Sequence, residues 1–269
     1  MTHMIYVVPS LKAKEKLQCE GKAWAESQGF TYVPRGKRTI QDLMDEYGED
    51  FLVYSSRGPQ IDRPEGSHFF SLNMAELRIQ NLRKGQRDHL LEALMGRGSS
   101  KLPITVLDCT CGFGADAAVA SFGLPTGSRV DALEVSPLLE AVTSWGFSHF
   151  VHKKDDVTAA LRRISLRHGD YRDYLLSDEG PVYDVLYFDP MFQRPVEASC
   201  QFQPVRAIME HGGLTRDLIE RALQKARRRV VIKERDFRQL CRDFPEVTLY
   251  GGKYSRIGYA VLECDSWKK

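Results

Sequence analysis

Hydrophobic and polar positions divide the chain into two blocks. In the first block, short β-branched and aromatic runs separated by helical patterns predict a small N-terminal α/β subdomain over residues 1–60. Its predicted strands are 5–8, 30–33 and 51–55, and its predicted helices are 11–27 and 39–47. The segment 58–72 has no regular period and is expected to form a loop. A basic helix is predicted over 74–95, and we expect residues 61–100 to connect the two blocks.

In the second block, over residues 101–269, predicted strands and helices alternate along the chain. The predicted strands are 104–109, 129–135, 164–169, 183–189, 228–233, 246–250 and 256–263. The predicted helices are 114–122, 137–146, 155–162, 171–176, 214–227 and 236–243. Such alternation predicts a parallel sheet with helices on both faces. The last two strands are too close in sequence for a crossover helix, so we expect them to form an antiparallel hairpin. This seven-stranded α/β arrangement resembles the Rossmann-like fold of class I methyltransferases.

The composition is that of an ordinary globular protein, with 28% charged and 42% hydrophobic residues. A net charge of +2 is too small to indicate a nucleic-acid-binding protein by itself, so any basic surface must be local. No apolar run approaches the roughly 18 residues that a membrane span needs, and residues 1–10 are too short and weakly apolar for a signal peptide. We therefore expect a cytoplasmic protein without a membrane partner.

The six cysteines indicate a reduced protein rather than a disulfide framework. None is paired in C-x-x-C spacing, and no secretory signal precedes them. Cys109 and Cys111 share one face of a strand end, where a metal or redox role would need further ligands. No second Cys/His pair is near them in sequence, so we expect two small buried packing residues and predict no metal.

A glycine-containing turn joins the first predicted strand of the second block to its helix. Gly112 and Gly114 have no Cβ, so the backbone there can turn sharply and approach a ligand closely. The turn also presents a helix N-terminus, whose free N–H groups attract negative charge. Two glycines alone are weak evidence for a nucleotide site, and the absence of a Gly-Lys-Ser/Thr sequence excludes a phosphate-binding P-loop.

Acidic residues mark four successive strand ends, which is where open α/β sheets bind ligands. They are Asp108 and Asp116 around the glycine turn, Glu134, Asp170 and Asp189. The Glu134 carboxylate can accept hydrogen bonds from both hydroxyl groups of a ribose, and Asp170 can accept one from an adenine amino group. Asp108 and Asp116 would repel a pyrophosphate but attract the ammonium group of a methionine. Each acid alone could be a helix cap or an exposed turn residue, but together they favour S-adenosyl-L-methionine over NAD, FAD or ATP.

The most specific stretch is Asp189-Pro190-Met191-Phe192, at the end of the fourth predicted strand. It is similar to the D/N-P-P-Y/F motif of methyltransferases that act on exocyclic amines of bases. Such an amine is a poor nucleophile because its lone pair is delocalised into the ring. Hydrogen bonds from the amine to Asp189 and to the Pro190 carbonyl would localise that lone pair, and Phe192 can stack on the base. We therefore predict catalytic roles for Asp189, Pro190 and Phe192.

With these stretches the chain resembles the RsmJ-like guanine-N2 methyltransferases of small-subunit ribosomal RNA. The matching stretches include Arg78, 84–86, 106–117, 133–137, 189–192 and 230–236. The resemblance implies that S-adenosylmethionine contacts Ala115, Asp116, Glu134, Val135, Asp170, Tyr171 and Asp189. It also implies that the target is the N2 amine of a guanine in 16S ribosomal RNA.

The sequence thus predicts a metal-independent, S-adenosylmethionine-dependent N-methyltransferase. The candidate contacts to ribosomal RNA, free or within the small subunit, are Arg78, Arg83, Lys84, Arg194, Lys233 and Arg235. A charged helix is also a common solvated surface, so basic residues alone do not identify RNA. Two alternatives remain open. One is an N-methyltransferase for another amine, such as a DNA base or a small molecule, and the other is a non-catalytic module that binds the cofactor and RNA.

Overall fold

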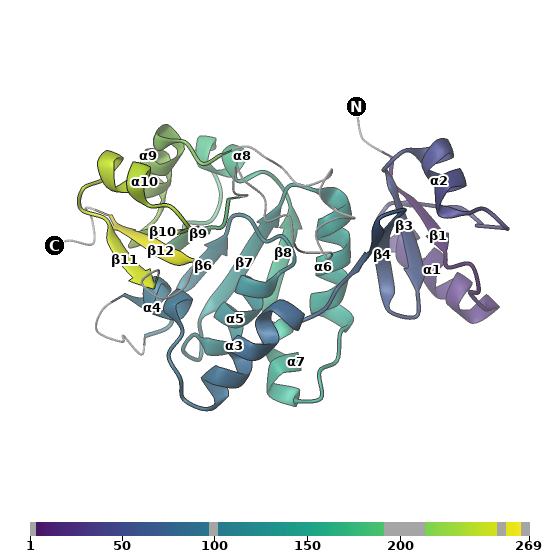
Figure 1. Ribbon diagram of the computed structural model, residues 1–269, viewed down its shortest axis with the longest axis horizontal. Coiled ribbons are helices and arrows are strands. Elements are labelled where there is room, and N and C mark those ends of the chain that lie inside the picture. The colour runs from purple at the N-terminus through teal and green to yellow at the C-terminus, as the bar shows by residue number, and fades with distance from the viewer. Residues whose placement is uncertain (1–3, 97–101, 191–212, 252–256, 265–269) are drawn as a thin grey trace. The chain divides into compact units, whose positions relative to one another are not determined.

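The computed structural model describes residues 4–96, 102–190, 213–251 and 257–264 (Figure 1). Within these residues the chain forms two compact units. The first unit comprises residues 4–71 and 136–150, and the second comprises the other described residues. Each unit has its own β-sheet, so the two are described in turn.

A five-stranded sheet forms the first unit, with the strand order β2-β1-β3-β4-β5. Its strands are β1 (Tyr6–Pro9), β2 (Thr31–Tyr32), β3 (Phe51–Ser55), β4 (Gly58–Arg63) and β5 (Gly66–Phe69). Its helices are α1 (Glu15–Ser27), α2 (Ile40–Tyr47) and α6 (Pro137–His149). β1 pairs in parallel with β2 and β3, whereas β4 pairs antiparallel with β3 and β5. The predicted N-terminal α/β region is confirmed.

The loop expected over 58–72 is wrong, because most of this segment forms β4 and β5. Gly58 takes a positive φ of 88° at a turn, and Pro59 lies at the start of β4, where a missing N–H is tolerated. β4 shows no alternation because it is buried along its whole length, including Gln60 and Asp62. The Gln60 amide donates to both Asp62 carboxylate oxygens, at 2.8 and 2.9 Å, which compensates for burying these polar groups.

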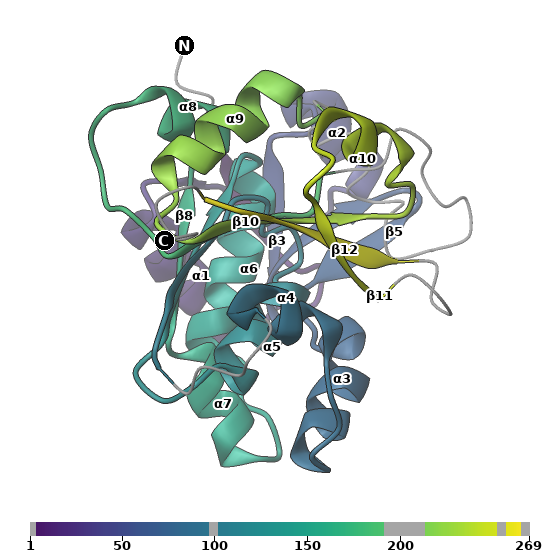
Figure 2. The same cartoon turned by 90° about the vertical axis from the view of Figure 1, so that its left-hand side faces the viewer.

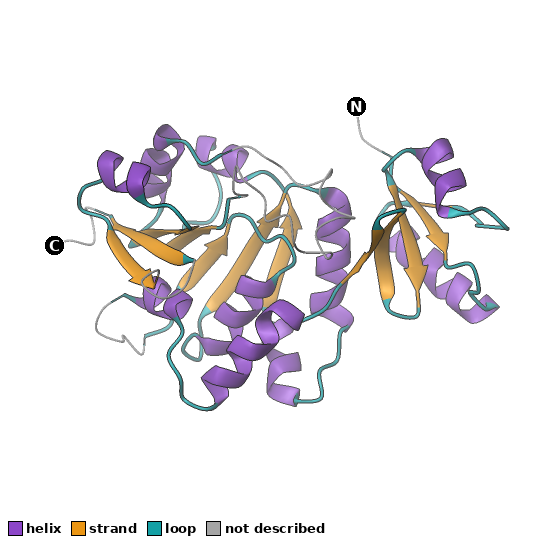
Figure 3. Ribbon diagram, viewed as in Figure 1, coloured by secondary structure: helices purple, strands orange, loops and turns teal. Residues whose placement is uncertain are grey.

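A seven-stranded sheet forms the second unit, in the order β11-β12-β10-β9-β6-β7-β8 (Figures 1 and 3). Its strands are β6 (Thr105–Asp108), β7 (Arg129–Glu134), β8 (Ile164–His168), β9 (Val185–Phe188), β10 (Arg229–Glu234), β11 (Thr248–Gly251) and β12 (Gly258–Glu263). Five neighbouring strands are parallel: β10, β9, β6, β7 and β8. The remaining pairs are antiparallel, since β12 pairs in this way with β10 and with β11. The predicted parallel sheet and its terminal antiparallel hairpin are therefore both confirmed.

Helices cover both faces of this sheet (Figure 2). One face carries α3 (Asn73–Arg83), α4 (His89–Met95), α5 (Ala115–Gly123) and α7 (Asp155–Leu161), and the other carries α8 (Tyr171–Leu176), α9 (Arg216–Lys225) and α10 (Arg238–Asp243). The single helix expected over 74–95 is in fact α3 and α4. Gly85 takes a positive φ of 76° after α3, and Asp88 begins α4 as its N-cap, so the helical path is interrupted between them.

Alternation along the strands separates the hydrophobic core from the polar side of the sheet. Leu107 and Leu186 are fully buried in a hydrophobic cluster that includes residues of α8 and α9. Side chains alternate between the two faces of a strand, so the neighbouring residues point to the face covered by α3, α4 and α5. On that face β6, β9 and β10 carry Asp108, Tyr187 and Lys233, which are buried or nearly buried polar side chains.

Candidate active site at the switch point of the sheet

The candidate site lies where the strand order of the large sheet reverses. From β6 the chain runs to β7 and β8 on one side, and β9 then returns to the other side of β6. Ligands of open α/β sheets bind at such a switch point, beyond the carboxyl ends of the strands. Directly after β9, the Asp189 backbone N–H donates to Thr110 Oγ1, which follows β6, at 2.7 Å. This hydrogen bond fixes the two strand ends to each other.

The turn between β6 and α5 is built around two glycines with left-handed backbone conformations. Gly112 and Gly114 have φ values of 54° and 74°, and Gly114 is the N-cap of α5. A Cβ at Gly112 would meet the Thr110 carbonyl oxygen at 3.9 Å, so strain rather than crowding favours glycine there. The Gly112 N–H donates to Glu134 Oε2 at 2.8 Å. The turn is therefore held from the end of β7 as well as from β6.

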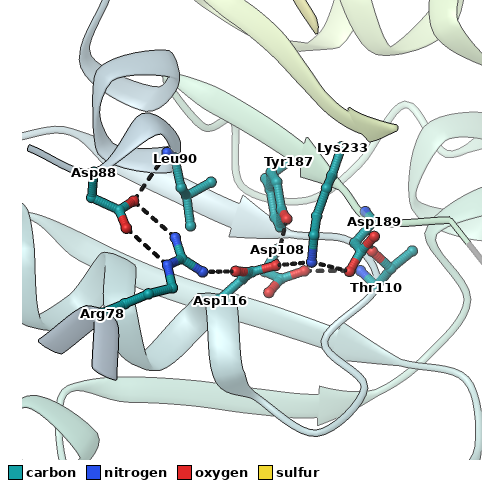
Figure 4. Close-up of polar contacts among 9 residues, drawn as sticks. All are labelled: Arg78, Asp88, Leu90, Asp108, Thr110, Asp116, Tyr187, Asp189 and Lys233. Carbon is teal, nitrogen blue, oxygen red and sulfur yellow. Dashed lines mark hydrogen bonds and ion pairs between the residues drawn. The ribbon is translucent and has the colours of Figure 1, made fainter. Parts of the chain in front are cut away.

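A row of alternating charges crosses the site, with Asp116 at its centre (Figure 4). Arg78 Nη1 donates to Asp116 Oδ1. Lys233 Nζ and the Tyr187 hydroxyl both donate to Asp116 Oδ2, at 2.8 and 2.7 Å. Arg78 also forms a bidentate ion pair with Asp88, with both N···O distances at 2.8 Å. Asp116 is buried, and these donors replace the water that its carboxylate loses on folding.

Lys233 connects Asp116 to Asp189. Its Nζ lies 2.7 Å from Asp189 Oδ2, and its side chain is only 15% exposed. Within the described part of the chain, no hydrogen bond reaches the other carboxylate oxygen of Asp189, Oδ1. One ammonium group is therefore shared between two carboxylates, and Asp189 keeps one oxygen for another donor.

Burial and neighbouring charges give the three aspartates of the site different pKa values. Burial raises the pKa of Asp108 well above its usual range, which favours the neutral acid. Burial also acts to raise the pKa of Asp116, but Lys233 and Arg78 outweigh it and hold that pKa below its usual range. The pKa of Asp189 is raised to about 6, because burial and the nearby Asp116 outweigh Lys233. At neutral pH the centre of the row is therefore ionised, and Asp189 titrates in mild acid.

Three further residues predicted to contact the cofactor lie at the edge of the glycine turn and the end of β7. Glu134 is buried and accepts the Gly112 hydrogen bond described above. Val135 follows it, and its backbone carbonyl oxygen lies 3.0 Å from His168 Nε2. Ala115 is the first residue of α5. The structure thus brings Ala115 and Glu134 to two sides of one turn.

The residues predicted at the third strand end have partners of their own. The Asp170 carboxylate is the N-cap of α8 and forms an ion pair with Arg172 at 2.7 Å. The Tyr171 ring lies in the hydrophobic core, in an edge-to-face contact with Phe188 at a centroid distance of 5.4 Å. Contacts from these two residues to a cofactor remain predictions.

Two residues predicted to contact RNA, Arg78 and Lys233, lie inside the site. Both are paired with carboxylates, so their charge is largely neutralised there. Three other predicted RNA contacts are exposed. They are Arg83, Lys84 and Arg235. Arg83 also pairs with Asp156, which is itself exposed.

Part of the predicted catalytic stretch is described and part is not. Asp189 and Pro190 lie at the end of β9, next to the glycine turn. Phe192 and the predicted RNA contact Arg194 lie outside the described residues. The roles predicted for Phe192 and Arg194 therefore remain predictions.

Three residues of the site, Tyr187, Thr110 and Asp88, were not predicted from the sequence. Tyr187 stands two positions before Asp189, and strand alternation alone could have placed both on one face. Thr110 lies in the turn that was singled out, but its partner Asp189 is far away in the sequence. Asp88 could not be assigned, because its role depends on where α3 ends and α4 begins.

Residues 67–257 match the model of a family described as "Putative SAM-dependent methyltransferase". The chain belongs to this methyltransferase family. Among its relatives, the YpiP protein of Bacillus subtilis is 29% identical over 230 residues, which cover 85% of this chain and 88% of that protein. The ribosomal RNA small subunit methyltransferase J of Marinobacter nauticus is 28% identical and covers 71% of this chain and 66% of its own length. The protein of the same name from Dechloromonas aromatica is 28% identical, with coverages of 71% and 76%.

A solved structure supports the fold of this methyltransferase. The crystal structure of the SAM-dependent methyltransferase NGO1261 from Neisseria gonorrhoeae superposes with a TM-score of 0.64. The match covers 97% of this chain and 96% of that one, at 18% sequence identity. The predicted Rossmann-like class I methyltransferase fold is therefore confirmed.

The site fits S-adenosylmethionine, the cofactor of this family. The described part of the site contains five carboxyl groups and two basic side chains. The carboxyl groups belong to Asp88, Asp108, Asp116, Glu134 and Asp189, and the basic side chains to Arg78 and Lys233. An excess of carboxylates attracts the sulfonium and ammonium groups of the cofactor and repels phosphates. No cluster that could hold a metal ion is found among the described residues, and none of their helices is long and apolar enough to cross a membrane.

Proposed function

We propose that this methyltransferase modifies the exocyclic N2 amine of a guanine in 16S ribosomal RNA. The ribosomal RNA small subunit methyltransferases J among its relatives support the substrate. The observation that carries the proposal is the placement of Asp189 at the switch point of the sheet, where Thr110 accepts from its backbone N–H and Lys233 donates to its carboxylate. A carboxylate followed by proline is the arrangement expected for accepting hydrogen bonds from an aryl amine.

The residues at the end of β9 would bind the target amine and activate it. One N–H of the amine would donate to Asp189 Oδ1 and the other to the Pro190 carbonyl oxygen. These two hydrogen bonds would draw the lone pair out of conjugation with the ring. When bound, S-adenosylmethionine supplies an activated methyl group on a positively charged sulfur. The protein then contributes mainly proximity and orientation.

The cofactor would be held by the residues at the other strand ends. The turn at Gly112 and Gly114, together with Ala115 and Asp116, would face its methionine part. Glu134 and Val135 would contact the ribose, because a carboxylate can accept from both hydroxyl groups. Asp170 and Tyr171 are the proposed neighbours of the adenine.

RNA would be held by exposed basic side chains. Arg83, Lys84 and Arg235 are exposed and are the proposed phosphate contacts, together with Arg194. Phe192 would stack on the target base. Phosphate contacts position the RNA and make its affinity depend on salt, but they carry no sequence information. A protein that modifies ribosomal RNA or the small subunit would act in the cytoplasm.

The proposal is tested by comparing modified nucleosides of 16S ribosomal RNA, using mass spectrometry, in strains with and without the gene. We expect N2-methylguanosine to fall in the deletion strain and to return when the wild-type gene is supplied. An Asp189→Ala gene should restore at most about one hundredth of the methylation rate. Loss of a different modified nucleoside, with N2-methylguanosine unchanged, would refute the proposed substrate.

A further inference from the structure

We infer that Lys233 is a positioning residue for the target amine, and not a contact to RNA phosphate. It shares its ammonium group between Asp116 and Asp189, and so determines which oxygen of Asp189 is left for the amine. The inference rests on the proposed function, because that function gives Asp189 its role as acceptor.

The position of Lys233 in the sheet fixes where its ammonium group can lie. It stands on β10, which is bordered by β9 on one side and β12 on the other, and it is paired in register with Tyr259. Its Nζ lies 2.8 Å from Asp116 Oδ2 and 2.7 Å from Asp189 Oδ2. Two of the three N–H donors of the ammonium group are therefore directed at carboxylates. A phosphate contact needs an accessible cation, whereas this side chain is mostly buried.

Asp116 is itself fixed, so it can anchor Lys233. The Tyr187 hydroxyl donates to the same oxygen of Asp116 that Lys233 contacts, and Arg78 donates to the other oxygen. Arg78 is in turn held by the bidentate pair with Asp88. The ammonium group therefore has one immobile partner, Asp116, and one partner at the reacting end of the site, Asp189. Such an arrangement sets the rotation of the Asp189 carboxylate.

The same contact sets the charge state of Asp189. Burial is the largest effect that raises its pKa, Lys233 opposes it, and Asp116 and Glu234 add to it. The titratable groups that interact with Asp189 come from four elements of the second unit. They are Lys233 and Glu234 on β10, Asp116 on α5, Asp108 on β6 and Tyr187 on β9. Lys233 is the only cation in this set, which is drawn from the described residues.

Two substitutions should therefore move the pH dependence of methylation in opposite directions. Lys233→Met removes the cation, so the pKa of Asp189 rises. The acidic limb of the pH profile should therefore shift to higher pH by about one pH unit or more. Asp116→Asn removes a negative charge, so the same limb moves down. Lys233→Met should also lower kcat about 10- to 100-fold, through loss of orientation, and leave the KM for RNA unchanged.

The experiment measures pH profiles of kcat and KM on 16S ribosomal RNA for both variants, with Lys22→Met as the control. Lys22 is an exposed lysine on α1, and its replacement should leave both parameters unchanged. If Lys233 instead contacts phosphate, Lys233→Met should raise the KM for RNA. The slope of log KM against log salt concentration should decrease by about one, and the acidic limb of the pH profile should stay in place. That result would overturn the inference.

A second measurement separates this inference from the proposed function. Carbon NMR of the protein without RNA reports the titration of the Asp189 carboxyl directly. The midpoint should rise in Lys233→Met and fall in Asp116→Asn, whatever the substrate is. If the wild-type protein fails to methylate 16S ribosomal RNA while these midpoints shift as expected, the proposed function fails and the Lys233 contact stands. Unchanged midpoints would refute the contact, and Lys233→Gln, which removes the charge but keeps a polar side chain, takes the place of Lys233→Met if that variant does not fold.

Discussion

Replacing Arg78 by methionine tests whether the charge row of the site stabilises the fold. Arg78 stands on α3 and joins two carboxylates from different elements, Asp88 at the start of α4 and Asp116 on α5. Its side chain is 26% exposed, and that of Asp88 is 11% exposed. Methionine keeps a similar unbranched stem, so the substitution removes chiefly the guanidinium group. Two largely buried carboxylates would then lose a donor at once.

The expected magnitude follows from this burial. Removing one partner of a fully buried ion pair costs about 3–5 kcal/mol, whereas exposed pairs contribute about 0–1 kcal/mol. Because a quarter of the Arg78 side chain is exposed, and Lys233 and Tyr187 remain on Asp116, we expect a loss of about 2–4 kcal/mol. Arg83→Met is the matched control on the same helix. Arg83 pairs with Asp156 and both side chains are more than a third exposed, so its loss should stay below about 1 kcal/mol.

Urea unfolding of the wild type and the two variants, at neutral pH and in acid, measures these differences. The pKa of Asp116 lies below its usual range in the folded protein, since Lys233 and Arg78 outweigh the effect of burial. The stability gained from this carboxylate is therefore present above the usual aspartate pKa of about 4, and is lost as the pH falls toward the folded value. The difference in the free energy of unfolding between the wild type and Arg78→Met should accordingly become smaller below about pH 4. Equal losses for Arg78→Met and Arg83→Met at neutral pH would refute the reasoning.

Two further predictions concern the packing of the first unit and the binding of the cofactor. In α6 a Cβ at Gly146 would lie 1.9 Å from the Phe70 ring, so Gly146→Ala should cost about 1–3 kcal/mol despite a gain in helix propensity of about 1 kcal/mol. Thermal unfolding measures this loss. The double variant Gly146→Ala/Phe70→Leu should lose less stability than the sum of the losses of the two single variants, because the smaller side chain relieves the clash. Strictly additive losses would contradict the contact. Glu134→Gln should weaken S-adenosylmethionine binding by about tenfold or more in calorimetry, and an unchanged Kd would remove Glu134 from the cofactor site.

Much of the second unit was predictable because its strands carry strong local signals. Apolar runs such as 104–107 are bounded by glycine, proline or charge, and each is followed by a segment with a helical pattern. The short gap between the last two strands leaves only an antiparallel hairpin. Local sequence also predicted the sharp turn at Gly114. Its positive φ at the N-cap of α5 follows from its place between a strand and a helix.

The β4–β5 hairpin was not predictable from these signals, because its polar residues are buried. Gln60 and Asp62 satisfy each other inside the sheet, so the segment has the composition of a loop but the hydrogen bonding of a strand. A proline next to a glycine strengthens the false impression of a break. Only the pairing with the neighbouring strand shows that Pro59 lies within β4.

The acidic residues of the site were predictable as a group, but their individual chemistry was not. Strand ends placed Asp108, Asp116 and Asp189 together, but nothing in the sequence explains why burial raises the pKa of Asp108, why two cations lower that of Asp116, and why that of Asp189 is raised to about 6. Those differences come from partners far away in the chain, and Lys233 is 117 positions from Asp116 and 44 from Asp189. Lys233, a basic residue of the stretch 230–236, was predicted to contact RNA. In the fold this lysine points inward and its charge lies between two carboxylates, which is why we infer that it orients Asp189 and does not contact phosphate.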